Sequence, residues 1–289
     1  MGNIVADGLR LFHSFPYAFG AGVILALVCS FLGVLVVLNR LVFIGATLSE
    51  VATCGIAASL FYRIHPFLGA VVLTLAAVSL LAFYSSEERL PHDSIMAAIF
   101  ILTSSLAVLF VSKSAFGLDE VRSLLYGDLI ITSAEDFKIL SLAVIPPILL
   151  IGLFFRPIVY TFLDRDAARV LGIKTRLWEL CFYYALGIVV SAASKLGGML
   201  LIFCYLVISP MTGLILSKRL WKSILIAMAA ALLSTFIGFH FSYAEDLPTN
   251  QAIIMAACFI FVFAAISAKI VSVVFKNFEF KKQHKNQPA

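Results

Sequence analysis

Long apolar stretches recur along the chain and are separated by short polar connectors. A helix needs about 20 residues to cross a hydrocarbon core roughly 30 Å thick, and these stretches have that length. They are continuous, whereas the strands of a membrane barrel would alternate apolar and polar residues. The pattern predicts an all-α polytopic membrane protein. Nine spans are expected, near residues 16–38, 46–62, 66–84, 94–112, 138–155, 177–193, 197–216, 224–243 and 251–274.

The first three predicted spans are joined by very short connectors. Residues 39–45 link the first two, and Arg63 to Pro66 link the second to the third. If one of these segments is a re-entrant or surface helix, the number of spans falls to eight. No simple internal repeat of the kind found in many secondary transporters is visible.

Composition supports a membrane protein without a water-soluble domain. Of the 289 residues, 62% are hydrophobic and 13% are charged, which is too little polar surface for a soluble globule. No connector is long enough to fold by itself, so residues 1–289 form one transmembrane domain. Any domain that hydrolyses nucleotides or captures a ligand would belong to another chain. The first residues lack the pattern of a cleavable signal peptide.

The positive charges predict the orientation. Alternating the spans back from a cytoplasmic C-terminus places most of the 21 Lys and Arg residues inside. The outer side holds Arg10, Arg63, Lys113, Arg122, Lys138 and Lys195. The positive-inside rule therefore puts residues 1–15 outside and the basic tail, 275–289, inside. Anionic headgroups of the lipid bilayer explain that tail without a nucleic-acid partner.

A lone acid, Glu50, lies within the second predicted span. A charge at the centre of a bilayer costs about 2.5 kcal/mol or more, so such acids usually face a bundle interior or a water-filled path. Glu50 is therefore a candidate functional residue. His240, in the eighth span, is either a hydrogen-bonding residue of the bundle or a metal ligand.

The five cysteines lie in or beside apolar stretches and show no CxxC spacing. This placement is typical of small buried residues. Farther along the chain, the pair Gly197 and Gly198 permits tight helix packing or a break, and Pro210 is expected to kink the following span.

The inward connector at residues 156–178 resembles a soluble segment more than any other connector does. Asp164 can cap a short helix that Gly172 ends. This helix is amphipathic, so it either rests on lipid or docks a cytoplasmic partner. In the second case the small residues Ala167 and Ala168 would permit close approach.

Two further connectors carry capping signals. On the outer side, Ser133 is expected to cap the fifth span, with Glu135 and Asp136 in its first turn. An acidic outer rim around residues 113–137 that attracts a cation or a partner is the alternative. Before the last span, Asp246 and Asn250 are expected to act as turn and cap residues.

Four short motifs occur together in one order along the chain. The matching residues are Arg40, Phe43, Gly45, Leu48, Ser49 and Gly55; Leu125, Tyr126, Gly127 and Leu129; Asp164, Ala168 and Gly172; and Asp246, Leu247 and Pro248. Together they resemble the membrane permease subunit of ATP-binding-cassette (ABC) importers for zinc, manganese and iron, the ABC-3 family. The resemblance covers nearly the whole chain after residue 15.

This resemblance implies a type II importer-like bundle in the cell (inner) membrane. Two permease subunits would enclose a path, two cytoplasmic ATPases would drive alternating access, and an external solute-binding protein would deliver the metal. The residues from Asp164 to Gly172, with Ala167 and Ala168, would form the coupling helix. The chain is not expected to be an enzyme, because ATP would bind the partner and the sequence has no GxxxxGK[ST] loop.

The chain departs from the family where the metal would bind. The family's aspartate and histidine, four residues apart, correspond to Ala46 and Glu50. A carboxylate without an imidazole shifts the preference toward harder ions such as manganese or ferrous iron. Cys54, one turn after Glu50, is either a second ligand or a packing residue. Ser209 also replaces an expected proline, with Pro210 one place later.

The leading hypothesis is a permease that imports a divalent transition metal. In one alternative the chain is half of a heterodimer, and a second permease supplies the missing aspartate and histidine. In another it is a membrane scaffold or sensor that retains the fold and does not transport. A membrane enzyme is disfavoured, because the spans hold no clear nucleophile and base pair.

Overall fold

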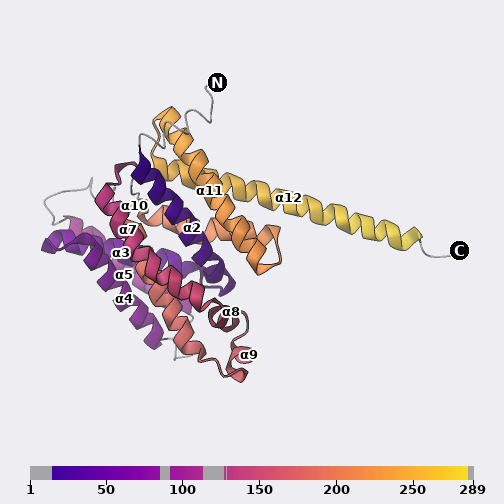
Figure 1. The fold of residues 1–289 in the computed structure, drawn as a ribbon, viewed down its shortest axis with the longest axis horizontal. Helices are drawn as coiled ribbons and strands as arrows, with labels where there is room; N and C mark the ends of the chain where they lie inside the picture. The colour runs from indigo at the N-terminus through magenta and orange to yellow at the C-terminus, as the bar shows by residue number, and fades with distance from the viewer. Residues whose placement is uncertain (1–14, 85–91, 113–126, 128, 286–289) are drawn as a thin grey trace.

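The computed structural model describes residues 15–84, 92–112, 127 and 129–285, and it describes side chains there except at 82–84, 92 and 271–285. Throughout these ranges every regular element is a helix (Figure 1). The helices are α2 (Pro16–Leu38), α3 (Val42–Tyr62), α4 (Pro66–Tyr84), α5 (His92–Ser112), η1 (Leu129–Ile131), α7 (Ala134–Leu153), α8 (Phe155–Leu163), α9 (Arg165–Val170), α10 (Thr175–Leu216), α11 (Leu220–Glu245) and α12 (Thr249–Lys285).

The predicted spans all fall on helices. Among the described residues, seven helices are long and apolar enough to cross a membrane, and α4 adds a shorter apolar helix over residues 66–81. The sixth and seventh predicted spans are the two arms of one element, the 42-residue α10. Its backbone leaves the helical region at Gly198, where φ is 65°. The predicted all-α membrane fold is therefore confirmed.

The break in α10 lies at one of the two positions that the sequence marked. Gly198 is the residue with non-helical torsions inside this helix, which confirms the break allowed at Gly197 and Gly198. Pro210 lies within the second arm at helical torsions, so the backbone departs from the helix at the glycine pair instead.

Two helical segments end at other residues than predicted. The fifth span ends at Leu153, and a separate helix, α8, occupies part of the predicted loop. The helix is interrupted at Phe154, three residues before Pro157, which has no N–H to donate to the Leu153 carbonyl. The C-terminal helix α12 continues to Lys285, so the predicted tail is helical up to that residue.

The central element is α10. It packs against α2, α3, α4, α7, α8, α11 and α12. At its crossing with α2, a Cβ built on Gly33 would lie 2.6 Å from Pro210 Cγ and closer still to the Leu206 carbonyl oxygen. Pro210 has no N–H to offer that carbonyl, which is four residues earlier. Gly33 lets the α2 backbone approach this carbonyl oxygen closely, as small residues do between membrane helices.

The helix α3 is enclosed by α4, α5 and α10. Its motif glycines mark two of these contacts. A Cβ on Gly45 would lie 3.0 Å from a Leu206 methyl group, and one on Gly55 would lie 2.8 Å from the Ala70 backbone. Ser49 donates to the Gly45 carbonyl at 2.8 Å, and Phe43 packs against Phe100 of α5. Phe43, Gly45 and Gly55 therefore pack α3 against its neighbours, whereas the Ser49 bond lies within the helix.

Three residues other than glycine adopt a left-handed conformation in the described structure, and each ends a helix. They are Arg40, Arg63 and Asp246. After Arg40, the Leu41 N–H donates to the Val36 carbonyl, and after Asp246 the Leu247 N–H donates to the Ser242 carbonyl. These bonds close tight turns of the Schellman type. Pro248 then follows immediately before α12.

Replacement of Gly33 by alanine tests the crossing of α2 and α10. A methyl group has no room there, so Gly33→Ala should lower the free energy of unfolding by about 1–3 kcal/mol. The control is Gly152→Ala, because a Cβ at that position would meet no atom within 4 Å. Thermal unfolding in detergent should separate the two variants. Equal midpoints would contradict the close backbone approach.

Candidate functional site

Glu50 lies near the middle of α3, and only 2% of its surface is exposed. The Ser104 hydroxyl of α5 lies near its carboxyl group. Ala46, one turn earlier and also buried, offers no donor atom. The site is therefore a single enclosed acid beside a hydroxyl, on the face that α3 turns toward α5.

Cys54 follows Glu50 by one turn, so the two residues share a face of α3. The Cys54 side chain is fully buried in an apolar cluster with Ala57, Ala107 and Val111. These neighbours favour packing as its role. Within the described ranges, no group of three or more His, Cys, Asp or Glu side chains is arranged to hold a metal ion. Glu50 and Cys54 are thus neighbours on α3 that do not form such a group with a third residue.

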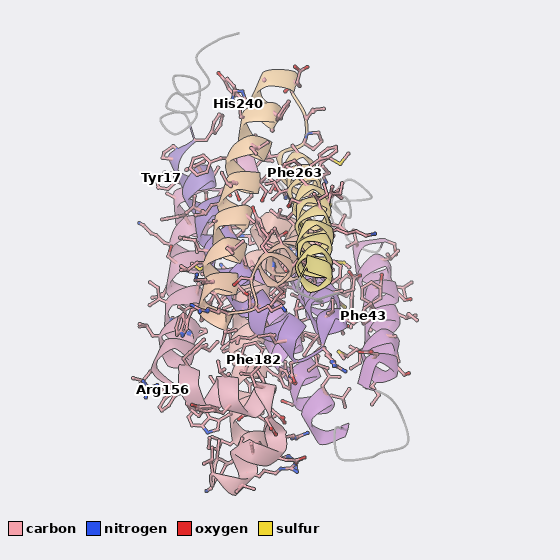
Figure 2. All side chains as sticks on the ribbon, turned by 90° about the vertical axis from the view of Figure 1, so that its right-hand side faces the viewer. Tyr17, Phe43, Arg156, Phe182, His240 and Phe263 are labelled. Carbon is pink, nitrogen blue, oxygen red and sulfur yellow. The ribbon has the colours of Figure 1, made fainter. Side chains whose placement is uncertain are left out.

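His240 lies near the end of α11, far from Arg156 at the opposite end of the bundle (Figure 2). Its ring packs edge-on against Phe241, and its buried Nδ1 has no hydrogen-bond partner in the described structure. The main neighbours of α11 are α2, α10 and α12, whereas those of α3 are α4, α5 and α10. The structure therefore does not bring His240 together with Glu50, and Nδ1 does not make the bundle hydrogen bond that is one of its two predicted roles.

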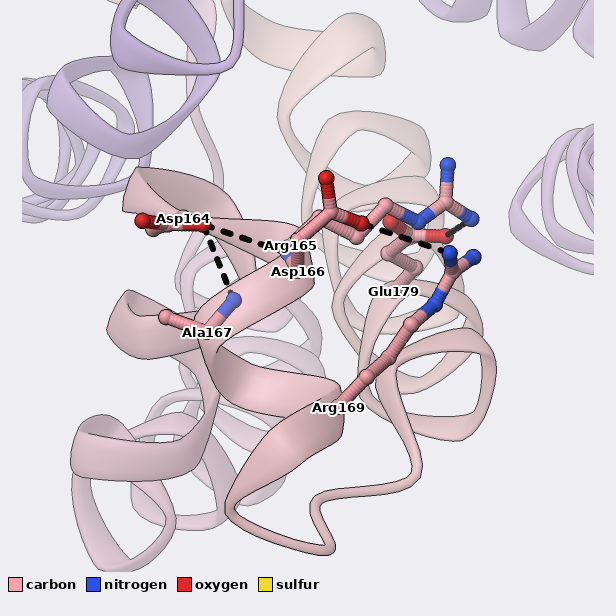
Figure 3. Close-up of polar contacts among 6 residues, drawn as sticks. All are labelled: Asp164, Arg165, Asp166, Ala167, Arg169 and Glu179. Carbon is pink, nitrogen blue, oxygen red and sulfur yellow. Dashed lines mark hydrogen bonds and ion pairs between the residues drawn. The ribbon is translucent and has the colours of Figure 1, made fainter.

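The short helix α9 has both of its predicted ends. Asp164 Oδ1 accepts the N–H groups of Asp166 and Ala167 at 3.2 and 3.0 Å (Figure 3). At the other end, the Ile173 N–H donates to the Ala168 carbonyl while Gly172 takes a φ of 76°. These contacts form an N-cap and a Schellman C-cap. The capped helix predicted from the sequence is confirmed.

The two alanines of α9 face different ways. Ala168 is fully buried, so its small size lets α9 rest on its own chain and not on a partner. Ala167 and Gly172 are exposed. Val170 is 88% exposed and Leu171 is 68% exposed, and the sequence analysis did not single out either residue. We call Ala167, Val170 and Leu171 the α9 face.

Ionic and aromatic contacts hold this segment against α10. The Arg165 guanidinium pairs with Glu179 of α10 at 2.9 Å, and Arg169 pairs with Asp166 within α9 at 3.5 Å (Figure 3). Exposed ion pairs add little stability, so the first pair mainly fixes position. The preceding helix α8 packs its Phe162 ring edge-on against Phe182 of α10.

The break in α10 is contacted by Gly127 of the second motif and by Asn250, which lies two residues after the fourth motif. A Cβ on Gly127, whose φ is 57°, would lie 2.5 Å from the Gly198 nitrogen. The side-chain amide of Asn250, at the start of α12, donates to the Gly197 carbonyl at 3.0 Å. Asn250 was expected to act in the turn before α12, and this long-range bond was missed. Leu125 and Tyr126 lie outside the described residues.

At the end of the bundle where α7 begins, the cap predicted at Ser133 is confirmed. Its hydroxyl accepts the Asp136 N–H at 3.1 Å. The Asp136 carboxylate also pairs with Lys195 of α10. Most of the acidic stretch considered as an outer rim, residues 113–126 and 128, lies outside the described residues.

Residues 12–268 match the profile of the ABC 3 transport family. The chain belongs to this family. Manganese import system permease protein ScaB of Streptococcus parasanguinis is 22% identical over 88% of this chain and 91% of its own length. High-affinity zinc uptake system membrane protein ZnuB of Haemophilus influenzae is 24% identical over 83% and 92%.

A solved structure shows the same fold. The structure of PsaBC from Streptococcus pneumoniae in complex with Fab matches with a TM-score of 0.80 at 20% identity. The match covers 90% of this chain and 93% of that chain. Together with the family, this likeness confirms the resemblance to membrane permease subunits of metal-ion ABC importers.

The cap of α9 can be tested by substitution. Asp164→Ala removes the acceptor for two N–H groups and should cost about 1 kcal/mol of local stability, whereas Asp164→Asn keeps an acceptor oxygen. Hydrogen exchange of the Asp166 and Ala167 amides should therefore quicken in the alanine variant and stay close to normal in the asparagine variant. Equal exchange in all three proteins would contradict the capping role.

Proposed function

We propose that this chain is the permease subunit of an importer that carries a divalent transition metal across the cell (inner) membrane by ATP-driven alternating access. Manganese, zinc and iron are the candidate substrates, and the relatives named for manganese import and zinc uptake support this class. ATP acts on a separate cytoplasmic ATPase. An external solute-binding protein delivers the metal, and the C-terminus lies in the cytoplasm.

The observation that carries this proposal is the α9 face. A six-residue helix, capped at both ends and paired to α10, holds Val170 and Leu171 away from the rest of the chain. Such a rigid apolar projection fits a groove on another protein, because its position is fixed before binding. We assign this face to the ATPase and treat α9 as the coupling helix.

Glu50 is the candidate for contact with the metal inside the permease. Its carboxylate and the neighbouring Ser104 hydroxyl are oxygen groups, which suit manganese and ferrous iron better than softer ions. Burial on the enclosed helix α3 is typical of an acid that serves a transport path. Two permease subunits would each contribute one Glu50.

A heterodimer is the second arrangement, and Ala46 favours it. At this position the chain has a methyl group where the family has an aspartate, so a partner permease with the full pair would restore the ligands. A scaffold or sensor that does not transport is the remaining alternative. It predicts that metal accumulation does not depend on Glu50.

Substitution of Val170 tests the docking face. Val170→Asp places a charge on the apolar projection and should reduce the amount of ATPase that copurifies with the chain by at least about tenfold, as expected for a central apolar contact. Ile131→Asp is the matched control, since Ile131 is 77% exposed and lies in η1, beyond the opposite end of α7. Equal copurification with both variants would remove α9 from the interface.

Glu50→Gln tests the metal path. The amide keeps the size of the side chain but loses the charge that attracts a cation, so metal-stimulated ATPase activity in reconstituted membranes should fall about tenfold or more. Glu135→Gln is the control, because it makes the same change at an exposed acid on α7. Full stimulation in the Glu50 variant would exclude this residue from the path.

A further inference from the structure

A chain of polar contacts begins at the α9 segment. The Arg165 side chain is about half exposed, but its partner Glu179 on α10 is largely enclosed, with 16% of its side chain accessible. Arg165 therefore reaches from the projecting segment to a carboxylate fixed in the bundle. This ion pair is the first link of the chain and joins α9 to α10.

The second contact lies one turn farther along α10. Glu179 and Tyr183 are four residues apart and share a helix face. Both residues belong to the continuous first arm of α10, so this arm links the Arg165 pair to the Tyr183 hydroxyl. That hydroxyl accepts a hydrogen bond from the Asn39 side-chain nitrogen at 3.2 Å. The contacts thus pass from α10 to the end of α2.

Asn39 occupies the corner between α2 and α3. It is the C-cap residue of α2, and Arg40 follows it in a left-handed conformation. The tight turn is short, because α3 already begins at Val42. Glu50 lies eight residues farther on, about 12 Å along the helix axis. A displacement of this corner would move α3, and Glu50 with it.

We propose that Arg165, Glu179, Tyr183 and Asn39 form a polar relay that passes movement of the ATPase-docking helix to α3. The inference rests on the proposed function, in which α9 follows the ATPase cycle. The four residues act as positioning residues, because none needs to touch the metal or ATP. Coupling of this kind requires a contiguous set of contacts between elements that move as units, and the corner at Asn39 provides one.

The neighbours of Tyr183 provide a contrast on the same helix. Phe182 packs against Phe162 of α8, and the Tyr184 hydroxyl pairs with Ser79 of α4 at 2.8 Å. Tyr183 therefore differs from Tyr184 in the element that its hydroxyl contacts. Removing either hydroxyl costs one hydrogen bond, but the relay passes through Tyr183 alone.

The test compares Tyr183→Phe with Tyr184→Phe in the complex of the chain with its ATPase, reconstituted in membranes. Manganese and zinc are supplied separately. Tyr183→Phe should lower metal-stimulated ATPase activity about two- to thirtyfold, the range expected for loss of one coupling contact. Copurification of the ATPase should stay unchanged, and Tyr184→Phe should retain normal stimulation. Equal effects of the two variants, or full stimulation in Tyr183→Phe, would overturn the relay.

A charge exchange separates the relay from general loss of structure. Arg165→Glu and Glu179→Arg should each reduce stimulation, and the double variant should restore most of it, because the pair is rebuilt with reversed signs. A double variant as defective as the single variants would contradict the proposal. If the unaltered chain bound no ATPase, the proposed function itself would fail. A normal complex with unaffected variants would refute the relay alone.

Discussion

In hydrocarbon, backbone groups without a partner are costly, and this constraint explains how the bundle is built around α10. The helix has two weak points, the break at Gly198 and the carbonyl of Leu206 that Pro210 leaves without its donor. At the break, the Asn250 amide donates to the Gly197 carbonyl, while Gly127 packs against the Gly198 nitrogen. At the second point, Gly33 of α2 approaches closely. Gly33, Gly127 and Asn250, which lie far apart in the sequence, thus all pack at the weak points of one helix.

The position of Glu50 follows from the same packing. Glycines at 45 and 55 let α3 settle against α10 and α4, so an acid in the middle of α3 is enclosed within the bundle. The chain keeps the backbone positions of the family motif but carries Ala46 and Glu50 at the two expected ligand positions. In the proposed function, metal binding would therefore rest on one carboxylate per subunit, unless a second kind of permease supplies further ligands.

Hydrophobic periodicity and capping residues are signals within short stretches of sequence. The features that depend on such signals were predicted correctly. The spans, the caps at Ser133 and Asp164, and the end of α9 at Gly172 were all found from short stretches. Long-range contacts have no local signal. The bond from Asn250 to Gly197, the contact of Tyr183 with Asn39, and the inward direction of Ala168 became visible only in the fold. For the same reason, the sequence did not show that His240 and Glu50 lie in different parts of the bundle.

The central claim is that this chain carries a divalent metal inward when an ATPase drives it. Uptake of labelled manganese, with zinc and ferrous iron as competitors, tests it in cells that lack their own importer and express the chain with its ATPase. We predict accumulation that stops when the ATPase is inactivated and that unlabelled competitors reduce. Accumulation that requires a second permease would favour the heterodimer. No ATP-dependent accumulation with any of the three metals, with or without that partner, would contradict the claim.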